Sequence, residues 1–455
     1  MREVKKGVRS EAANYVTKGK AMRRLHLKAK QFHRLCILKG IFPREPKKKT
    51  SSKTYYHLKD IRFLEHEKLL DKFREIDAWM KKVRKAKMRG DDVKAKNMTI
   101  MKPDYTLHHL VKERYPAFGD ALADLDDALT LICLFASCPS HKDLTITHQM
   151  VQESDRLWRE FQLYLVSARA VRKVFLSIKG IYYQADIKGQ IVTWLVPYQF
   201  SQSLPLDVDY SIMLTFLEFY HTLLRFVNYK LYADIEAAYP PDLSQPVDTF
   251  VSQTKIPETT MDLVGSEFLK GTEMEALGKV REETMQIRGL FQGLVFLLGR
   301  ETPRYSLELV IRACGGEIVA QDCERVTHQV VDRPMEATAG TREYLQPQWV
   351  YDSLNFRIRL PLAPYRPGLQ PPPHLSPFVD SREEEYIPER LTEILQLKGE
   401  PLPAAAAPEP EHAALGKLVM PKKLRKLYQT MQYGLRKKKA LIDRLHKRYS
   451  SQANS

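Results

Sequence analysis

The sequence lacks the signatures of secreted and membrane proteins. It holds only five cysteines, an odd number with no CxxC spacing, so a reducing intracellular setting fits better than a disulfide framework. The most apolar stretch, around residues 129–136, is too short to span a bilayer. The first ten residues, MREVKKGVRS, contain no apolar run of the kind that a secretory signal peptide needs. We therefore expect a soluble protein with no membrane partner.

Catalytic and metal-binding motifs are also missing. The chain contains no GxxxxGK[ST], GxGxxG, HExxH or GxSxG pattern, so we expect neither enzymatic activity nor a cofactor. Four potential metal ligands, Cys133, Cys138, His141 and His148, are separated by four, two and six residues, which matches no common zinc pattern. Cys133 also lies in an apolar run, where a thiol behaves as a small hydrophobic side chain. The sequence therefore predicts no metal site.

The positive charge is abundant but unevenly distributed. The formal net charge is +17, and residues 1–60 hold 18 Lys and Arg against 4 Asp and Glu. Residues 417–448 hold 12 against 1, so the body between these segments is mildly acidic. Clustered cations indicate a polyanionic partner, because phosphate neutralisation releases counterions. Nuclear import signals use the same clusters, and both interpretations remain open.

The N-terminal cations alternate with apolar residues. The apolar set predicts a short helix with one buried and one cationic face, and its members are Leu25, Leu27, Phe32, Leu35, Cys36, Ile37 and Leu38. Interleaved aromatic side chains, such as Phe32 and Tyr56, either stack on unpaired bases or belong to the core. The candidate RNA-binding residues are Lys18, Lys20, Arg23, Arg24, Lys28, Lys30, Arg34, Lys47, Lys48 and Lys49.

The periodicity predicts an α+β multidomain chain. Residues 1–240 indicate a mainly helical domain, with helices expected over 54–90, 118–137, 148–178 and 210–238 and a small β-hairpin that turns at Lys188-Gly189. A linker is expected over 241–286, an α/β domain of order β-α-β-β-loop-β-α over 287–366, a Pro-rich and acidic linker over 367–416, and a basic helix and tail over 417–455. The basic helix offers a second candidate surface, made of Lys422, Lys423, Arg425, Lys426, Arg436, Lys437, Lys438 and Lys439.

Several segments of the chain resemble known families. Residues 287–366 resemble a BRCT domain, with a structural Gly315-Gly316 turn after the first helix and Trp349 in the last helix as an expected core residue. Nearly the whole chain is similar to the pescadillo family through FHRLCILKGIFPREPKKK, VFLSIKGIYYQA, THQVVDRP, YLQPQWVYDS and PPPHLSPFV. The acidic tract usual after the BRCT domain in this family is reduced here to Glu383–Glu385 and scattered acids.

The resemblance implies a function that composition cannot supply. Pescadillo proteins are nuclear scaffolds, found in the nucleolus and nucleoplasm, that mature the precursor of large-subunit rRNA and 5.8S rRNA. The implied partners are pre-rRNA, 66S-type pre-ribosomal particles, and a block-of-proliferation protein with a WD-repeat protein (the PeBoW complex). The alternative is a nuclear BRCT scaffold in DNA-damage or cell-cycle signalling. Phosphopeptide-reading BRCT domains carry Ser or Thr after the first strand, whereas this chain reads Leu297-Leu298-Gly299.

Overall fold

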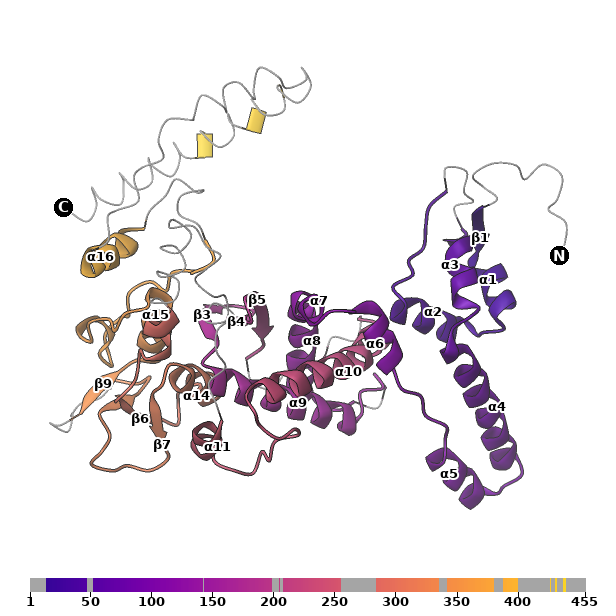
Figure 1. Ribbon diagram of the computed structural model, residues 1–455, viewed down its shortest axis with the longest axis horizontal. Helices are drawn as coiled ribbons and strands as arrows, with labels where there is room; N and C mark the ends of the chain where they lie inside the picture. Colours follow the sequence, from indigo (N-terminus) through magenta and orange to yellow (C-terminus); the bar gives the residue numbers. More distant parts are fainter. Residues whose placement is uncertain are drawn as a thin grey trace, which may run out of the picture. The chain divides into compact units, whose positions relative to one another are not determined.

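The computed structural model describes residues 14–46, 52–141, 143–198, 204, 208–254, 284–334, 342–379 and 388–399, together with Lys426, Thr430, Met431, Lys437 and Lys438 (Figure 1). The chain divides into two compact units, Met1–Pro377 and Phe378–Ser455. The first unit combines helical layers with a three-stranded and a four-stranded sheet, which confirms the α+β class. Among the helices in the described ranges, none is long and apolar enough to cross a membrane.

The first unit begins with a small two-stranded sheet surrounded by helices. Its elements are β1 (Tyr15–Thr17), α1 (Lys18–Leu25), α2 (Ala29–Leu38), β2 (Tyr55–His57), α3 (Leu58–Leu64), α4 (Lys68–Met88) and α5 (Asp92–Ile100). The strands pair antiparallel, with Val16 opposite Tyr56. The sequence predicted one helix where the structure has α1 and α2, because His26 adopts a left-handed conformation (φ 55°) that ends α1. Buried apolar residues on both helices, such as Leu25 and Leu35, still form one core face.

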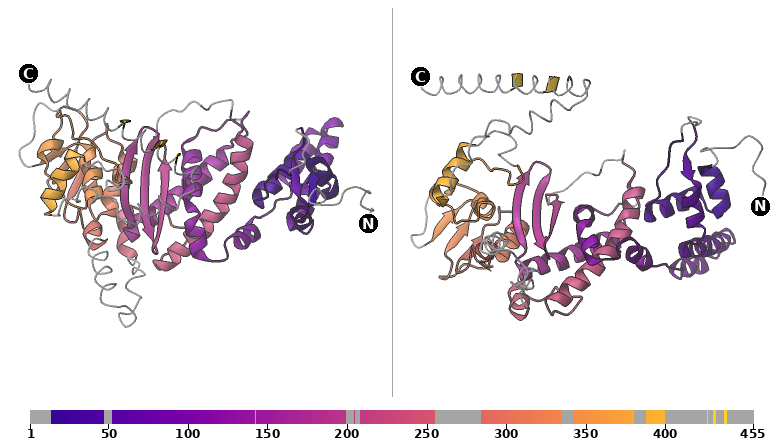
Figure 2. Two further views of the ribbon diagram at one scale, coloured as in Figure 1. Left: turned by 90° about the horizontal axis from the view of Figure 1, so that it is seen from above. Right: turned by 45° about the horizontal axis from the view of Figure 1, so that its top comes forward.

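A helical layer and an antiparallel meander follow. The helices are α6 (His108–Arg114), α7 (Phe118–Ala123), α8 (Leu125–Ser137), α9 (His148–Ala168), α10 (Tyr210–Asp234) and α11 (Val247–Gln253), and the strands are β3 (Val171–Ser177), β4 (Gly180–Ile187) and β5 (Gln190–Val196). The predicted hairpin is confirmed as β4–β5, with Lys188 and Gly189 both at positive φ in its turn. Figure 2 shows the three strands side by side, with α8 packed beside β5 and α15 (Pro347–Phe356) beside β3.

The helix predicted over 148–178 was wrong in its last third. α9 ends at Ala168, where Arg169 adopts a left-handed conformation (φ 48°), and the chain enters β3 two residues later. β-branched and aromatic side chains in this segment, such as Val171 and Phe175, favour a strand. The meander therefore has three strands where the sequence predicted two.

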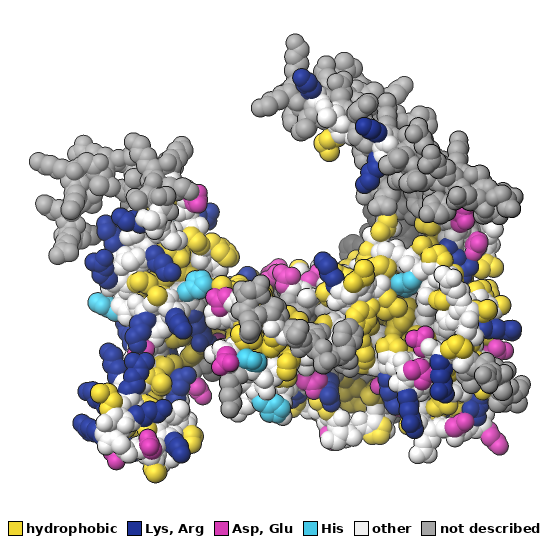
Figure 3. All heavy atoms as spheres, turned by 180° about the vertical axis from the view of Figure 1, so that it is seen from behind, with side chains coloured by type: hydrophobic (Ala, Val, Ile, Leu, Met, Phe, Trp, Pro, Cys, Tyr) yellow, Lys and Arg dark blue, Asp and Glu magenta, His cyan; other side chains and the backbone are white. Residues whose placement is uncertain are grey.

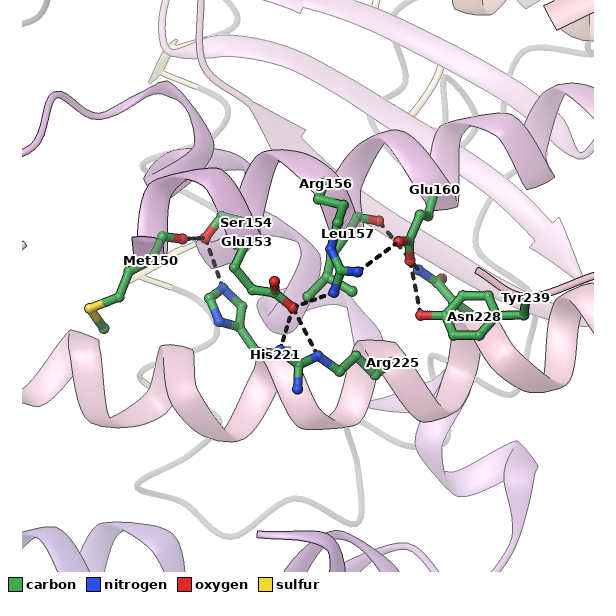
Figure 4. A network of polar contacts seen from close by, with 10 residues as sticks. All are labelled: Met150, Glu153, Ser154, Arg156, Leu157, Glu160, His221, Arg225, Asn228 and Tyr239. Carbon is green, nitrogen blue, oxygen red and sulfur yellow. Dashed lines mark hydrogen bonds and ion pairs between the residues drawn. The ribbon is translucent and has the colours of Figure 1, made fainter. Parts of the chain in front are cut away.

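A polar network joins α9 to α10 (Figure 4). His221 is buried and its Nε2 lies 2.8 Å from Ser154 Oγ, while the buried Glu160 carboxylate accepts a hydrogen bond of 2.9 Å from the Tyr239 hydroxyl. Burial lowers the pKa of His221 to about 4, because desolvation penalises the charged imidazole more than nearby Glu153 supports it. The helix pair is thus held by a neutral histidine inside the apolar layer.

The last part of the first unit is a parallel sheet with helices packed on it. Its elements are β6 (Val295–Leu298), α14 (Arg304–Ala313), β7 (Glu317–Val319), β8 (His328–Val330), β9 (Glu343–Leu345), α15 and the 3₁₀ turn Ala363–Tyr365. The strand order is β7-β6-β8-β9 and all three pairings are parallel. This matches the predicted order β-α-β-β-loop-β-α.

The second unit contains α16 (Glu389–Lys398) among its described residues. Arg390 and Glu393 form an i,i+3 ion pair of 2.7 Å on this helix, and Gly399 ends it in a left-handed conformation (φ 69°). The sequence predicted only linker composition here.

Candidate functional site

The predicted cationic surface is built on α1 and α2. On α1, Lys20, Arg23 and Arg24 are exposed on the side opposite to the buried Ala21 and Leu25. This separation follows from the 3.6-residue period, which places the apolar residues of a short helix on one stripe. The structure therefore presents the α1 cations to solvent.

The remaining cations of this surface lie on α2 and at its two ends. Lys28 and Lys30 are exposed, whereas Lys18 and Arg34 are half-buried. Three of the candidates are already neutralised within the protein, and their ion pairs are Arg24–Glu65, Lys28–Asp77 and Arg34–Glu218. In the described part of the chain, Lys18, Lys20, Arg23 and Lys30 have no acidic partner in an ion pair.

The interleaved aromatic residues do not all face solvent. Phe32 and Tyr56 are buried, and their rings meet edge to face with centroids 5.2 Å apart. Tyr15 packs edge to face on His57 at 5.6 Å. Phe32 and Tyr56 therefore belong to the core of this region, so base stacking by these two rings is excluded unless the core opens.

A buried ion-pair cluster fixes the end of α2. The side chain of Lys39 is 6% exposed and its Nζ lies 2.5 Å from Glu67 Oε2 and 2.6 Å from Glu113 Oε2. His109 Nε2 lies 2.8 Å from the other oxygen of Glu67. Burial opposes ionisation of Glu67, but its contacts with Lys39 and His109 lower the pKa of its carboxyl overall. Sequence reasoning missed this cluster, since its members are up to 74 residues apart.

Some predicted candidates fall outside the described residues. These are Lys47, Lys48 and Lys49, and Lys422, Lys423, Arg425, Arg436 and Lys439 of the C-terminal segment. Lys426, Lys437 and Lys438 are described, and all three are helical and exposed. The proposal of a basic C-terminal helix thus stays a prediction.

The structure also presents a cationic stretch that the candidate set left out. Six basic residues on the distal half of α4 and just after it are exposed, namely Lys81, Lys82, Arg84, Lys85, Lys87 and Arg89. Figure 3 shows Lys and Arg side chains gathered over the α4 region. The signal was visible in the sequence as a dense run of Lys and Arg.

The BRCT-like region shows why its two glycines are required. Gly315 has φ +82°, and a Cβ at Gly316 would lie 2.7 Å from Ile311 Cγ2, closer than real Cβ atoms approach. Trp349 is 2% exposed and its Nε1 donates a hydrogen bond of 2.8 Å to the Leu360 carbonyl. These residues therefore shape the core between the sheet and the helices.

This region is joined to the meander by buried polar contacts. The hydroxyls of Tyr183 on β4 and Tyr351 on α15 lie 2.7 Å and 2.9 Å from the Oγ of the fully buried Ser306 on α14. Burial raises the pKa of both phenols well above their usual range, so the hydroxyls remain protonated donors. We call this cluster of three residues the hydroxyl triad.

The outer edge of β3 is covered by the same region. The side-chain amide of Asn355 accepts a hydrogen bond of 2.9 Å from the Val174 N–H and donates one of 2.7 Å to the Val174 carbonyl. His374 Nε2 accepts from the Leu176 N–H at 3.2 Å, and its ring stacks on Phe175. Because Val174 and Leu176 are two residues apart, their backbone groups point to the same, unpaired side of the strand. Side chains therefore replace the missing neighbouring strand.

The described residues contain no group of three or more His, Cys, Asp or Glu that could hold a metal ion. Cys133 is buried, and desolvation raises the pKa of its thiol well above the usual value. This thiol packs as an apolar side chain.

Comparison with known proteins agrees with these observations. The model of the Pescadillo N-terminus matches residues 5–263, more than half of the chain, and the model of the BRCA1 C Terminus (BRCT) domain matches residues 286–354. This chain belongs to the Pescadillo family. A Pescadillo homolog of Nematostella vectensis is 39% identical over 97% of this chain and 95% of its own length. Pescadillo of Danio rerio is 41% identical over 87% and 76%, and a Pescadillo homolog of Chlamydomonas reinhardtii is 42% identical over 87% and 71%.

Membership of the Pescadillo family supports a general role in nucleolar ribosome biogenesis, in association with ribosome-assembly particles. The family consists of scaffold-type proteins.

Proposed function

We propose that this protein is a nucleolar and nucleoplasmic scaffold for assembly of the large ribosomal subunit. It binds pre-rRNA within 66S-type pre-ribosomal particles and is required for processing to mature large-subunit rRNA and 5.8S rRNA. Its protein partners are a block-of-proliferation protein and a WD-repeat protein. Membership of the Pescadillo family supports the general role in ribosome biogenesis. The proposed contact with RNA is supported by the cations of the α1–α2 surface.

The observation that carries the RNA contact is the unpaired part of the α1–α2 surface. Lys20, Arg23 and Lys30 are exposed and, within the described ranges, take part in no ion pair. Folding thus leaves their charge available, whereas Arg24, Lys28 and Arg34 are already compensated. Unpaired cations on a folded surface bind a phosphate backbone by displacing condensed counterions. The rings of Phe32 and Tyr56 are buried and cannot stack on bases. This surface is therefore suited to contact the phosphate backbone of RNA rather than its bases.

The test compares two variants of the full chain that lose the same charge. The first carries Lys20→Gln, Arg23→Gln and Lys30→Gln. The control carries Lys72→Gln, Arg159→Gln and Lys230→Gln, whose ammonium or guanidinium groups form ion pairs of 2.9–3.1 Å within their own helices. For a large-subunit precursor RNA, the plot of log K against log salt should flatten by about 2–3 in the first variant, since each lost phosphate contact lowers the slope by about 0.7–0.9. The control should keep the wild-type slope.

Crosslinking in cells separates this function from the alternative. Recovery of large-subunit precursor RNA with the tagged protein is the expected result. Recovery of chromatin and phosphoproteins without precursor RNA would instead support a BRCT scaffold in DNA-damage or cell-cycle signalling. Equal slopes for the two variants would remove the α1–α2 surface from the RNA interface.

A further inference from the structure

The distal half of α4 carries a cationic surface that is separate from the one on α1 and α2. Its members, called here the distal cationic face, are Lys81, Lys82, Arg84, Lys85, Lys87 and Arg89. All six side chains are exposed. From the first to the last, this stretch rises by about 12 Å at 1.5 Å per helical residue. Six positive charges therefore follow one another along roughly two turns of helix.

The opposite side of α4 explains why these cations are held in place. Val83 and Ala86 are buried against Ala95 of α5, and Trp79 and Met98 complete this small apolar cluster. The Trp79 Nε1 also donates a hydrogen bond of 2.6 Å to the Met98 carbonyl. Figure 1 shows α5 lying beside the end of α4. The α4–α5 pair is thus a rigid support that turns its charged side to solvent.

The two halves of α4 differ in whether their Lys and Arg side chains form ion pairs. In the proximal half, Lys72 Nζ lies 2.9 Å from Glu75, and Arg74 lies 3.2 Å from Asp71. In the distal half, none of the six cations forms an ion pair with any described residue. Lys81, Lys85 and Arg89 also follow at i, i+4 and i+8, a spacing at which like charges repel and weaken a helix. A bound polyanion would remove this repulsion.

We propose that the distal cationic face binds the phosphodiester backbone of structured RNA, as a second contact beside the α1–α2 surface. This inference rests on the proposed function, since it assumes that the scaffold engages RNA. Four of the six side chains are lysines, which act on phosphates as point charges rather than as bidentate readers of bases. The indole of Trp79 is engaged with α5 and with Lys82, whose Nζ lies 5.7 Å from the ring centroid. The contact is therefore independent of base sequence and sensitive to salt.

The test uses the full chain and a labelled RNA stem-loop as the probe. The distal variant carries Lys81→Gln, Arg84→Gln, Lys85→Gln and Arg89→Gln, four exposed members of the distal cationic face. The matched control carries Lys72→Gln, Arg159→Gln, Lys230→Gln and Arg304→Gln, four exposed cations that each pair with an acid three or four residues away. Both variants lose four positive charges, so a difference between them reports position rather than net charge. Circular dichroism verifies that the helical content is unchanged.

The distal variant should bind the stem-loop about tenfold or more weakly at low salt, and its salt slope should fall by about three. The control should keep the wild-type slope, and a stem-loop of scrambled sequence should give the same results. Suppose that the distal variant kept the wild-type salt slope while the variant with Lys20→Gln, Arg23→Gln and Lys30→Gln had a smaller one. This inference would then be overturned, and the proposed function would stand. A wild-type chain that binds no RNA would overturn both. Loss of binding to polyglutamate without loss of binding to RNA would assign the face to an acidic protein instead, and would also overturn the inference.

Discussion

The hydroxyl triad offers a sharp test of whether the BRCT-like region and the meander are one folded body. Ser306→Ala removes the only oxygen that lies within hydrogen-bond distance of both the Tyr183 and the Tyr351 hydroxyls among the described residues. Both tyrosines are buried, so water cannot replace the lost partner without opening the junction. An unsatisfied buried polar group costs about 1–3 kcal/mol. Two stranded hydroxyls should therefore lower the free energy of unfolding by about 2–5 kcal/mol, after a few tenths are regained from the helix propensity of alanine.

Removing all three hydroxyls together should be far less harmful. The triple variant Ser306→Ala, Tyr183→Phe and Tyr351→Phe leaves no polar atom unpaired in the triad, so it should cost about 0–1.5 kcal/mol. Tyr183→Phe alone leaves Ser306 its contact with Tyr351 and should cost about 0.5–1.5 kcal/mol. The single substitution Ser306→Ala should therefore destabilise the protein more than the triple variant does.

Urea unfolding followed by tryptophan fluorescence measures this ranking. Trp194 on β5 and Trp349 on α15 are both buried, one on each side of the junction, so the emission reports both sides. For Ser306→Ala, the urea concentration at the midpoint of unfolding should fall, while the slope of the free energy of unfolding against urea stays unchanged. An unchanged slope identifies a change of stability rather than a change in the surface exposed on unfolding. If Ser306→Ala cost no more than Tyr183→Phe, and the triple variant were the least stable, the triad would be wet in solution and the junction would be open.

Three further predictions concern single side chains. Gly316→Ala should lower the free energy of unfolding by about 1–3 kcal/mol in thermal melts, because its Cβ would overlap Ile311. Trp349→Ala should cost about 3–5 kcal/mol in urea unfolding, as a large buried ring leaves a cavity. Between pH 4 and 6.5 the unfolded chain protonates His221 while the folded chain does not, so stability should rise with pH by about 3 kcal/mol across this window. In urea titrations repeated at several pH values, the free energy of unfolding of the His221→Gln variant should show little of this rise.

The order of elements in the BRCT-like region could be predicted from the sequence because its signals are local. The Gly315-Gly316 pair ends one helix, and Pro347 begins the next at a position where proline is tolerated. The hairpin was predictable for the same reason, since Lys188-Gly189 marks its turn. Each of these signals depends on the conformations that a few neighbouring residues prefer.

The failure at β3 has an equally physical cause. Val171 and Val174 are buried, three residues apart, because the register of β3 on β4 shifts between Val171 and Lys173. A bulged strand therefore presents its apolar residues at the spacing of a helix, and the period alone selects the wrong structure. No glycine or proline marks the end of α9, since Arg169 itself takes the left-handed conformation.

The candidate surface could be located from the sequence, but its unpaired charges could not. The density of Lys and Arg identified the residues on α1 and α2, yet the partners Glu65, Asp77 and Glu218 are 41, 49 and 184 residues away. Pairing over such distances is a property of the fold. It decides which cations remain available to a phosphate. The cations of the distal cationic face are among these, since they form no ion pair with any described residue.

The edge of β3 bears on what the BRCT-like region can bind. An open edge strand exposes backbone donors and acceptors and invites pairing with other chains. Here the side chains of Asn355 and His374 form hydrogen bonds with the outward backbone groups of Val174 and Leu176. These bonds hold α15 and the segment after it against the meander. Separating the two regions would expose these groups together with the hydroxyl triad, and the cost of that exposure makes independent movement of the BRCT-like region unfavourable. At the end of β6 the chain reads Leu297-Leu298-Gly299 and offers no side-chain hydroxyl there. The two features together favour a BRCT-like region that stiffens a scaffold over one that samples phosphorylated partners as a free module.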